Sequence, residues 1–151
     1  MTAVAERPSA SSSGSGVATI ASRAQSWAQA NPTQLAMRVK DYGIWREMPW
    51  SEVWDTILDA SHGLLALGAA PGDRISIHAE DRPEWVMLDI ATVAIRGTTV
   101  GMYPTNPAAE VEYTLNDCGA KIHIVEDQEQ ADKVIDPVSY THLTLPTILL
   151  V

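Results

Sequence analysis

The fold is decided by residues 71–107, which read PGDRISIHAEDRPEWVMLDIATVAIRGTTVGMYPTNP. Residues 74–79 are predicted to form a strand, because they follow a Pro-Gly-Asp turn. A helix is expected to start at 81–84, with proline in its first turn, and to run to Gly97. Residues 98–103 return as a strand. This strand–helix–strand unit is typical of a parallel sheet with right-handed crossovers.

The same alternation continues toward the C-terminus. Asn106 is expected to open a helix with Val111 and Leu115 on its inner face, and residues 121–126 follow as a third strand. A last short helix begins after Asp127, whose side chain is placed to cap it. The predicted fold class is therefore α/β, with alternating strands and helices forming part of a parallel sheet in an incomplete domain.

Upstream of this unit the sequence predicts a helix, a short hairpin and a second helix. Residues 22–31 form the first helix, and two strands at 34–40 and 44–49 flank a turn at 41–43. Ser51 is expected to cap the second helix, which stops at Gly68. Its apolar face has helical spacing and comprises Val53, Trp54, Ile57, Ala60, Leu64 and Leu67.

The run from Ile75 to His78 alternates apolar and polar residues, which a strand buried on both faces does not normally do. Two interpretations stay open. Either one face of the sheet meets a polar environment, or this strand lies towards an edge.

Composition divides the 151 residues into three parts. Residues 1–18 are rich in serine and glycine and are predicted to be a disordered leader. Residues 19–137 have the mixture of charged, apolar and turn residues that is typical of a folded domain. Residues 138–151 contain no Asp, Glu, Lys or Arg. We interpret them as a non-native tail translated from an adapter oligonucleotide, the alternative being a genuine strand interrupted by Pro146.

The net charge and the cysteine content argue against several classes of protein. Ten Lys+Arg against 19 Asp+Glu give a formal charge of −9, which argues against a nucleic-acid partner. One cysteine excludes an intramolecular disulfide and favours the cytoplasm. The sequence has no apolar stretch long enough to form a transmembrane segment.

The residues provide no convincing catalytic, cofactor-binding or metal site, so all three are predicted to be absent. His78 and Glu80 match half of a zinc deaminase motif, which also needs a Cys-x-x-Cys pair. Cys118 and His123 fall on a helix end and a strand, with nothing to position one against the other. His62 is interpreted as a solvated helix residue.

The acidic pairs Asp81/Glu84 and Glu110/Glu112 are interpreted as helix-start and solvated carboxylates. The stretch from Tyr103 to Pro107 follows the carboxyl end of a strand, where open α/β sheets bind ligands. An ordinary strand–turn–helix connection with its own cap is the favoured interpretation.

The order of several short motifs resembles the N-terminal region of AMP-forming acyl-CoA synthetases, most closely the bacterial long-chain fatty acid–CoA ligases. The motifs are Pro49-Trp50-Ser51-Glu52, Gly63-Leu64-Leu65-Ala66-Leu67-Gly68, Pro71-Gly72-Asp73-Arg74-Ile75, Asp81-Arg82-Pro83-Glu84-Trp85, Tyr103-Pro104-Thr105-Asn106-Pro107 and Asn116-Asp117-Cys118-Gly119-Ala120-Lys121. The resemblance runs from about Ile20 to Val134. It implies a full-length enzyme that uses ATP, Mg²⁺ and CoA to convert a fatty acid first to an acyl-adenylate and then to a thioester.

The family's phosphate loop ending in Pro-Lys-Gly and its late catalytic lysine have no counterparts here, so no catalytic residue is transferred. The matched motifs are explained by folding, with Gly68 and Gly72 at stops and turns, Asp81 and Asn106 as caps, and Trp85 in the core. We expect a cytoplasmic fragment that is inactive alone; the resemblance also allows peripheral membrane association of the full-length enzyme. The alternative is a small α/β ligand- or nucleotide-binding module without catalysis.

Overall fold

The computed structural model describes residues 18–138 and 147–150 and confirms the predicted α/β class. In chain order the elements are α1 (Ile20–Ala30), β1 (Leu35–Asp41), β2 (Ile44–Pro49), α2 (Trp50–Ala66), β3 (Arg74–His78), α3 (Pro83–Ala94), β4 (Thr98–Met102), α4 (Ala108–Cys118), β5 (Ile122–Val125), α5 (Gln128–Val138) and β6 (Thr147–Leu150). The predicted leader lies outside the described residues except for residue 18. Of the predicted non-native tail, only Val138 and β6 are described.

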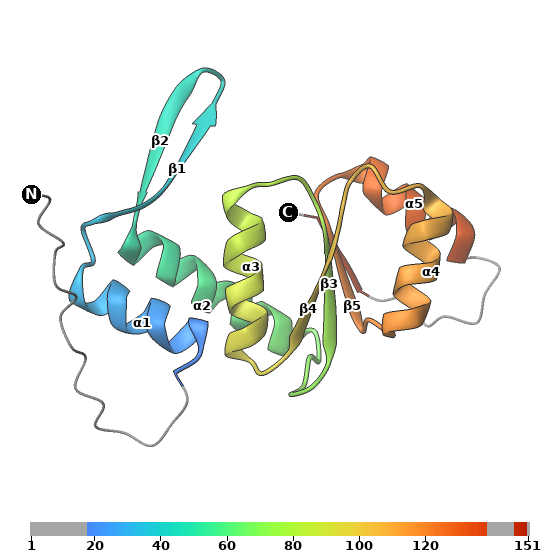
Figure 1. The fold of residues 1–151 in the computed structure, drawn as a ribbon, viewed down its shortest axis with the longest axis horizontal. Coiled ribbons are helices and arrows are strands. Elements are labelled where there is room, and N and C mark those ends of the chain that lie inside the picture. The colour runs from blue at the N-terminus through green and yellow to red at the C-terminus, as the bar shows by residue number, and fades with distance from the viewer. Residues whose placement is uncertain (1–17, 139–146, 151) are drawn as a thin grey trace, which may run out of the picture.

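The main sheet is parallel, with strand order β4-β3-β5-β6. Helices α1, α2 and α3 cover one face, and α4 and α5 cover the other (Figure 1). On the first face Ile75, Ile77, Ile122 and Ile124 join the larger core. Strand β3 is central, so the interpretation that it lies towards an edge is wrong.

The hairpin is confirmed as a separate antiparallel sheet of β1 and β2. At its turn Tyr42 and Gly43 have φ values of 45° and 84°, the two positive angles that a tight hairpin turn with the correct twist requires. Met48 near the base of β2 is buried, whereas residues 40–47 are exposed. The hairpin therefore projects from the body of the molecule (Figure 1).

Helix α2 starts without the side-chain cap predicted at Ser51. The helix begins one residue earlier, with Pro49 in the cap position. The amides of Trp50 and Ser51 instead donate to the carbonyls of Gln34 and Pro32, at 2.9 and 3.0 Å. Tertiary backbone hydrogen bonds thus satisfy the first two amides of α2, and Ser51 lies inside the helix rather than at its cap. The helix stop predicted at Gly68, with φ 89°, is confirmed.

The predicted caps Asp81 and Asn106 are also wrong. Helix α3 has Arg82 in the cap position and α4 has Pro107, and neither start has a side-chain cap hydrogen bond. Proline fixes the backbone near the first turn of each helix, and this preorganises the start without a capping side chain. In contrast, Oδ1 of Asp127 accepts from the amide of Gln130 at 3.0 Å, which confirms the cap of α5.

Candidate functional site at the carboxyl edge of the sheet

Strands β3, β4 and β5 run parallel and end at the same edge of the sheet, where open α/β folds place their ligands. The segments that follow these strands form an open depression. It is lined by Glu80, Pro104, Thr105, Glu126, Asp127, Glu129, Gln130 and Lys133. The strand ends predicted as the place for a ligand are therefore brought together.

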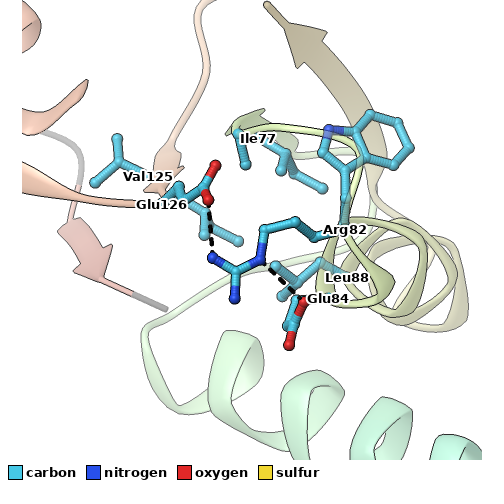
Figure 2. Close-up of a pocket in the computed structure, with 9 residues that line it drawn as sticks. Ile77, Arg82, Glu84, Leu88, Val125 and Glu126 are labelled. Carbon is cyan, nitrogen blue, oxygen red and sulfur yellow. Dashed lines mark hydrogen bonds and ion pairs between the residues drawn. The ribbon is translucent and has the colours of Figure 1, made fainter. Parts of the chain in front are cut away.

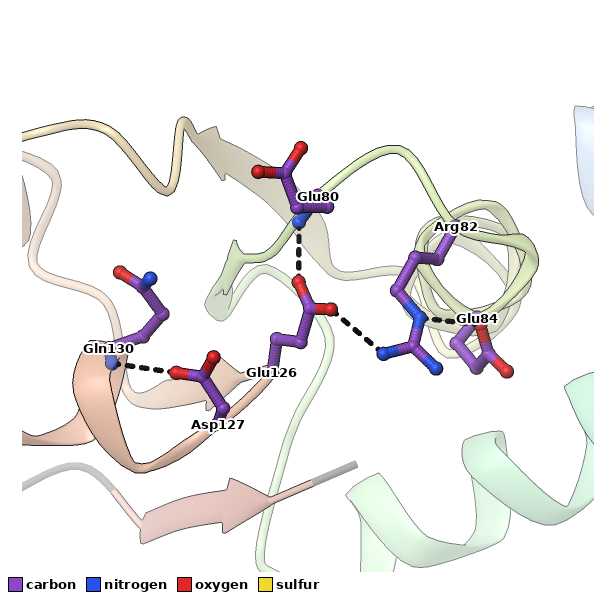
Figure 3. A network of polar contacts seen from close by, with 6 residues as sticks. All are labelled: Glu80, Arg82, Glu84, Glu126, Asp127 and Gln130. Atoms are coloured by element: carbon purple, nitrogen blue, oxygen red, sulfur yellow. Dashed lines mark hydrogen bonds and ion pairs between the residues drawn. The ribbon is translucent and has the colours of Figure 1, made fainter. Parts of the chain in front are cut away.

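Glu126 is the centre of the polar network at this edge (Figure 3). One carboxylate oxygen accepts from the backbone amide of Glu80 at 2.8 Å, and the other accepts from Arg82 at 2.8 Å. Arg82 also pairs with Glu84 at 3.4 Å. The bond from the Glu80 amide, followed by that from Arg82, holds the pKa of Glu126 below its ordinary value despite an opposing effect of burial. An ionised, twice-bonded carboxylate ties β5 to the segment after β3, and is unsuited to proton transfer near neutral pH.

The Arg82 side chain lies over an apolar recess and has Glu126 on one side and Glu84 on the other (Figure 2). Ile77 and Leu88 contribute to the walls of this recess. Its volume is about 20 Å³, which corresponds to about one water molecule. This recess is too small to take an acyl chain.

The cation at the other side of the depression is already engaged. Nζ of Lys133 donates to the carbonyl of Pro104 at 2.6 Å and to the side-chain oxygen of Gln130 at 3.0 Å. Thr105 is exposed, and the amide of Asn106 donates to the carbonyl of Tyr103 at 3.0 Å. The segment from Tyr103 to Pro107 thus has the hydrogen bonds of a strand–turn–helix connection.

A buried polar cluster lies on the sheet face that points toward α4 and α5. Ser76, His78 and His123 are all 0% exposed. The Ser76 hydroxyl and Nδ1 of His123 are joined by a hydrogen bond of 2.6 Å. The carbonyl of Tyr103 can only accept, so Nε2 of His78, at 3.1 Å, carries the proton of that ring. The polar face inferred from the strand pattern is therefore an interior face.

Both imidazoles are held in the neutral form. Burial lowers the pKa of His123 to about 4, and His78 acts in the same direction. Burial is also the main cause of the lowered pKa of His78, followed by the charge of Lys133. The rings are 5.7 Å apart, and within the described residues Nδ1 of His78 and Nε2 of His123 have no hydrogen-bond partner. Single motifs in the sequence do not indicate this pair; the available signal is the alternation of polar residues with isoleucine in both strands.

The other residues considered from the sequence are not brought together. Cys118 is half-buried at the end of α4, where its thiol donates to the carbonyl of Leu115 at 3.6 Å, while His123 is bonded to Ser76. His62 is exposed on α2, as predicted. Glu80 is exposed whereas His78 is buried, which does not favour the zinc half-motif. Within residues 18–138 and 147–150, no three His, Cys, Asp or Glu side chains are grouped to hold a metal ion.

No helix in the described part of the chain combines the length and apolarity needed to span a membrane.

Comparisons with known proteins agree on one family. The family described as "AMP-binding enzyme" matches residues 24–149. The long-chain-fatty-acid–CoA ligase FadD15 of Mycobacterium bovis is 34% identical over 94 residues, which is 62% of this chain and 16% of FadD15. The long-chain-fatty-acid–CoA ligase ACSBG2 of Xenopus laevis is 28% identical over 101 residues, 67% of this chain and 14% of ACSBG2. The chain thus spans about a sixth of the length of these relatives.

Solved structures agree with the fold. The N-terminal domain of FACL13 from Mycobacterium tuberculosis superposes with a TM-score of 0.76 at 21% identity, covering 89% of this chain and 34% of that domain. The anthranilate CoA ligase AuaEII, in complex with anthranoyl-AMP, gives a TM-score of 0.76 at 24% identity. The superposition covers 87% of this chain and 24% of the AuaEII chain.

Proposed function

This chain belongs to the AMP-binding enzyme family, and from that premise we propose that it supplies the N-terminal part of the large α/β domain of a long-chain fatty acid–CoA ligase. The observation that carries the proposal is the family match over residues 24–149 together with fatty acid–CoA ligases among the relatives. In the full-length enzyme a fatty acid carboxylate would attack the α-phosphorus of ATP and release pyrophosphate. The thiol of CoA would then attack the acyl carbon and release AMP.

The residues at the carboxyl edge do not fit the triphosphate of ATP. Four carboxylates line the depression, those of Glu80, Glu126, Asp127 and Glu129. Its one cation, Lys133, is bonded to a carbonyl and an amide oxygen. A phosphate site of this kind needs a free cation, and the one cation lining this depression is already bonded. We therefore assign no chemical step to these residues.

What the residues of this chain do in the proposed enzyme is structural. Glu126 and Arg82 fix the loop after β3 against the end of β5, and Lys133 fixes the loop after β4 against α5. Catalytic groups are expected on sequence outside this chain, because no Pro-Lys-Gly loop occurs within it. The chain alone is therefore proposed to be inactive, and the full-length enzyme to be cytoplasmic.

The activity is tested with the purified chain, palmitate, ATP, Mg²⁺ and CoA. No pyrophosphate and no palmitoyl-CoA are expected, and formation of either product would overturn the proposal. Sequencing the source genome beyond codon 137 separately tests the proposal that the chain is part of a long-chain fatty acid–CoA ligase. The expected continuation encodes a Ser/Thr/Gly-rich loop with Pro-Lys-Gly, and the complete enzyme is expected to use palmitate in preference to anthranilate. A preference for anthranilate would refute the substrate class.

A nucleotide-binding module without catalysis is the alternative function. It predicts that ATP raises the melting temperature of the chain and that substitution of Thr105 and Asn106 abolishes the increase. The carboxylates around these residues favour the opposite result, because they repel a nucleotide's phosphates.

A further inference from the structure

The two buried histidines on the sheet face toward α4 and α5 each have one unused ring nitrogen. His78 and His123 come from neighbouring strands, β3 and β5, and are 0% exposed. Within the described residues, no hydrogen-bond partner reaches Nδ1 of His78 or Nε2 of His123. A buried polar atom without a partner costs free energy, so two such atoms on adjacent rings indicate a ligand that both rings can bind.

Hydrogen bonds at the other nitrogen of each ring fix which nitrogen carries the proton. Nε2 of His78 donates to the carbonyl of Tyr103 at 3.1 Å, so Nδ1 of His78 has a free lone pair. The Ser76 hydroxyl donates its single hydrogen to the carbonyl of Ile122 at 3.4 Å. Nδ1 of His123 therefore donates to Ser76 at 2.6 Å, and Nε2 of His123 also has a free lone pair. The unused atoms are thus two acceptors, which bind a cation or a hydrogen-bond donor.

This arrangement has the features of histidines that bind a metal ion. A metal-bound imidazole is neutral and donates its other N–H to an oxygen atom, as both rings do here. The bond from an imidazole nitrogen to a metal is about 2 Å long, so an ion between two rings separates the ring centres by about 6 Å. The centres of the His78 and His123 rings are 5.7 Å apart. The ring separation therefore suits one ion bound by both imidazoles.

The surroundings of the pair favour a soft ion of single charge. Met102 lies opposite His78 in the register of β3 and β4, is 4% exposed and packs with residues of α4 and α5, so its thioether is on the same sheet face. Within residues 18–138 and 147–150, no third His, Cys, Asp or Glu side chain joins the pair. The charges that act on His78, those of Lys133 and Asp127, have opposite signs. A divalent ion would therefore stay largely uncompensated in the interior, whereas imidazole and thioether donors suit Cu(I).

We propose that Nδ1 of His78 and Nε2 of His123 bind one Cu(I) ion, with the thioether of Met102 as a third donor. The two histidines are far apart in the sequence and belong to no metal-binding motif, so the sequence predicts no site here. They meet because β3 lies directly beside β5. Ser76 is a positioning residue, because it holds the His123 ring through Nδ1 and does not touch the ion.

The experiment measures Cu(I) binding to the full 151-residue chain. Every sample carries Cys118→Ala, His62→Gln and His142→Gln, which remove the one thiol and the other two histidines. Cu(I) is supplied under argon with ascorbate during refolding from urea, because both rings are fully buried in the folded chain. Bathocuproine disulfonate competes for the ion, and one equivalent is expected to stay with the chain. Adding His123→Leu should weaken Cu(I) binding at least about 100-fold, and adding Ser76→Ala about tenfold.

Ser61→Ala is the matched control for Ser76→Ala, because it removes a buried hydroxyl from α2, which covers the opposite face of the sheet. It should leave the Cu(I) affinity unchanged. Two further measurements leave the histidines and Met102 intact. ¹⁵N NMR of the metal-free chain should show Nδ1 of His78 and Nε2 of His123 without a bound hydrogen. X-ray absorption of the Cu(I)-loaded chain should show both nitrogen and sulfur neighbours of copper.

Three results would overturn the proposal: no retained Cu(I), an affinity that His123→Leu leaves unchanged, or a hydrogen on either of the two nitrogens. Unprotonated nitrogens without retained Cu(I) would assign the two lone pairs to a buried water molecule instead of an ion. Equal weakening by Ser61→Ala and Ser76→Ala would refute the positioning role of Ser76. None of these measurements depends on acyl-CoA formation, so the proposal stands or falls separately from the ligase function.

Discussion

Acidification from pH 7 to pH 5 should destabilise this protein mainly through its buried imidazoles. Burial lowers the pKa of His123 to about 4 from its ordinary 6.5. Between these two values the unfolded chain binds a proton at this residue and the folded chain does not. The contribution of His123 to the unfolding free energy is therefore fully present above about pH 6.5 and is lost as the pH decreases toward about 4. The lowered pKa of His78 acts in the same direction.

The magnitude follows from the gap between the two pKa values of His123. The whole gap corresponds to about 3 kcal/mol of unfolding free energy, of which about 2 kcal/mol is lost between pH 7 and pH 5. Asp73 and Glu126 have lowered pKa values, so their contributions are lost only as the pH falls below the ordinary values of 3.8 and 4.5. The interval from pH 7 to pH 5 therefore reports on the histidines.

The assay is urea unfolding followed by far-ultraviolet circular dichroism at both pH values. The unmodified chain is expected to lose about 2 kcal/mol, and His123→Leu less than half of that. His62→Gln is the control, because His62 is exposed on α2 and its replacement should leave the loss unchanged. Equal stability of the unmodified chain at pH 7 and pH 5 would refute the reasoning. An unchanged loss in His123→Leu would refute the assignment to this residue.

Three further predictions concern individual contacts. Gly97→Ala should lower the unfolding free energy by about 1–3 kcal/mol, because the new Cβ would lie 3.1–3.2 Å from two backbone oxygens. Gly63→Ala should raise the unfolding free energy by up to about 1 kcal/mol, because nothing lies within 4 Å of the new Cβ. Thermal unfolding of both variants tests the difference. Glu126→Gln should cost about 1 kcal/mol in the same measurement by weakening the bonds at the strand ends, and no loss would show that the network is not stabilising. Lys121→Met should raise the pKa of Asp73 toward its ordinary value in a carboxyl NMR titration, because the bond of 2.8 Å from Lys121 is the main cause of the lowered value; an unchanged titration would contradict this.

The sequence by itself determined the elements and the family. Turn residues and apolar spacing are local signals, so the hairpin turn at Tyr42 and Gly43, the apolar face of α2 and the cap at Asp127 were all predictable. The family resemblance also came from short motifs in order, and the match over residues 24–149 confirms it. These features depend on neighbours within a few positions along the chain.

Only the tertiary structure decided where the polar groups lie and what they contact. Ser51 gave no cap because α2 begins one residue before it, where the carbonyls of Gln34 and Pro32 accept the amides of Trp50 and Ser51. His78 and His123 became an interior pair because β3 took the central place between β4 and β5. Glu126 reaches an amide 46 residues earlier in the chain. Burial and hydrogen bonding across such separations depend on strand order, and local patterns do not specify strand order because the same strands and helices can be assembled in more than one arrangement.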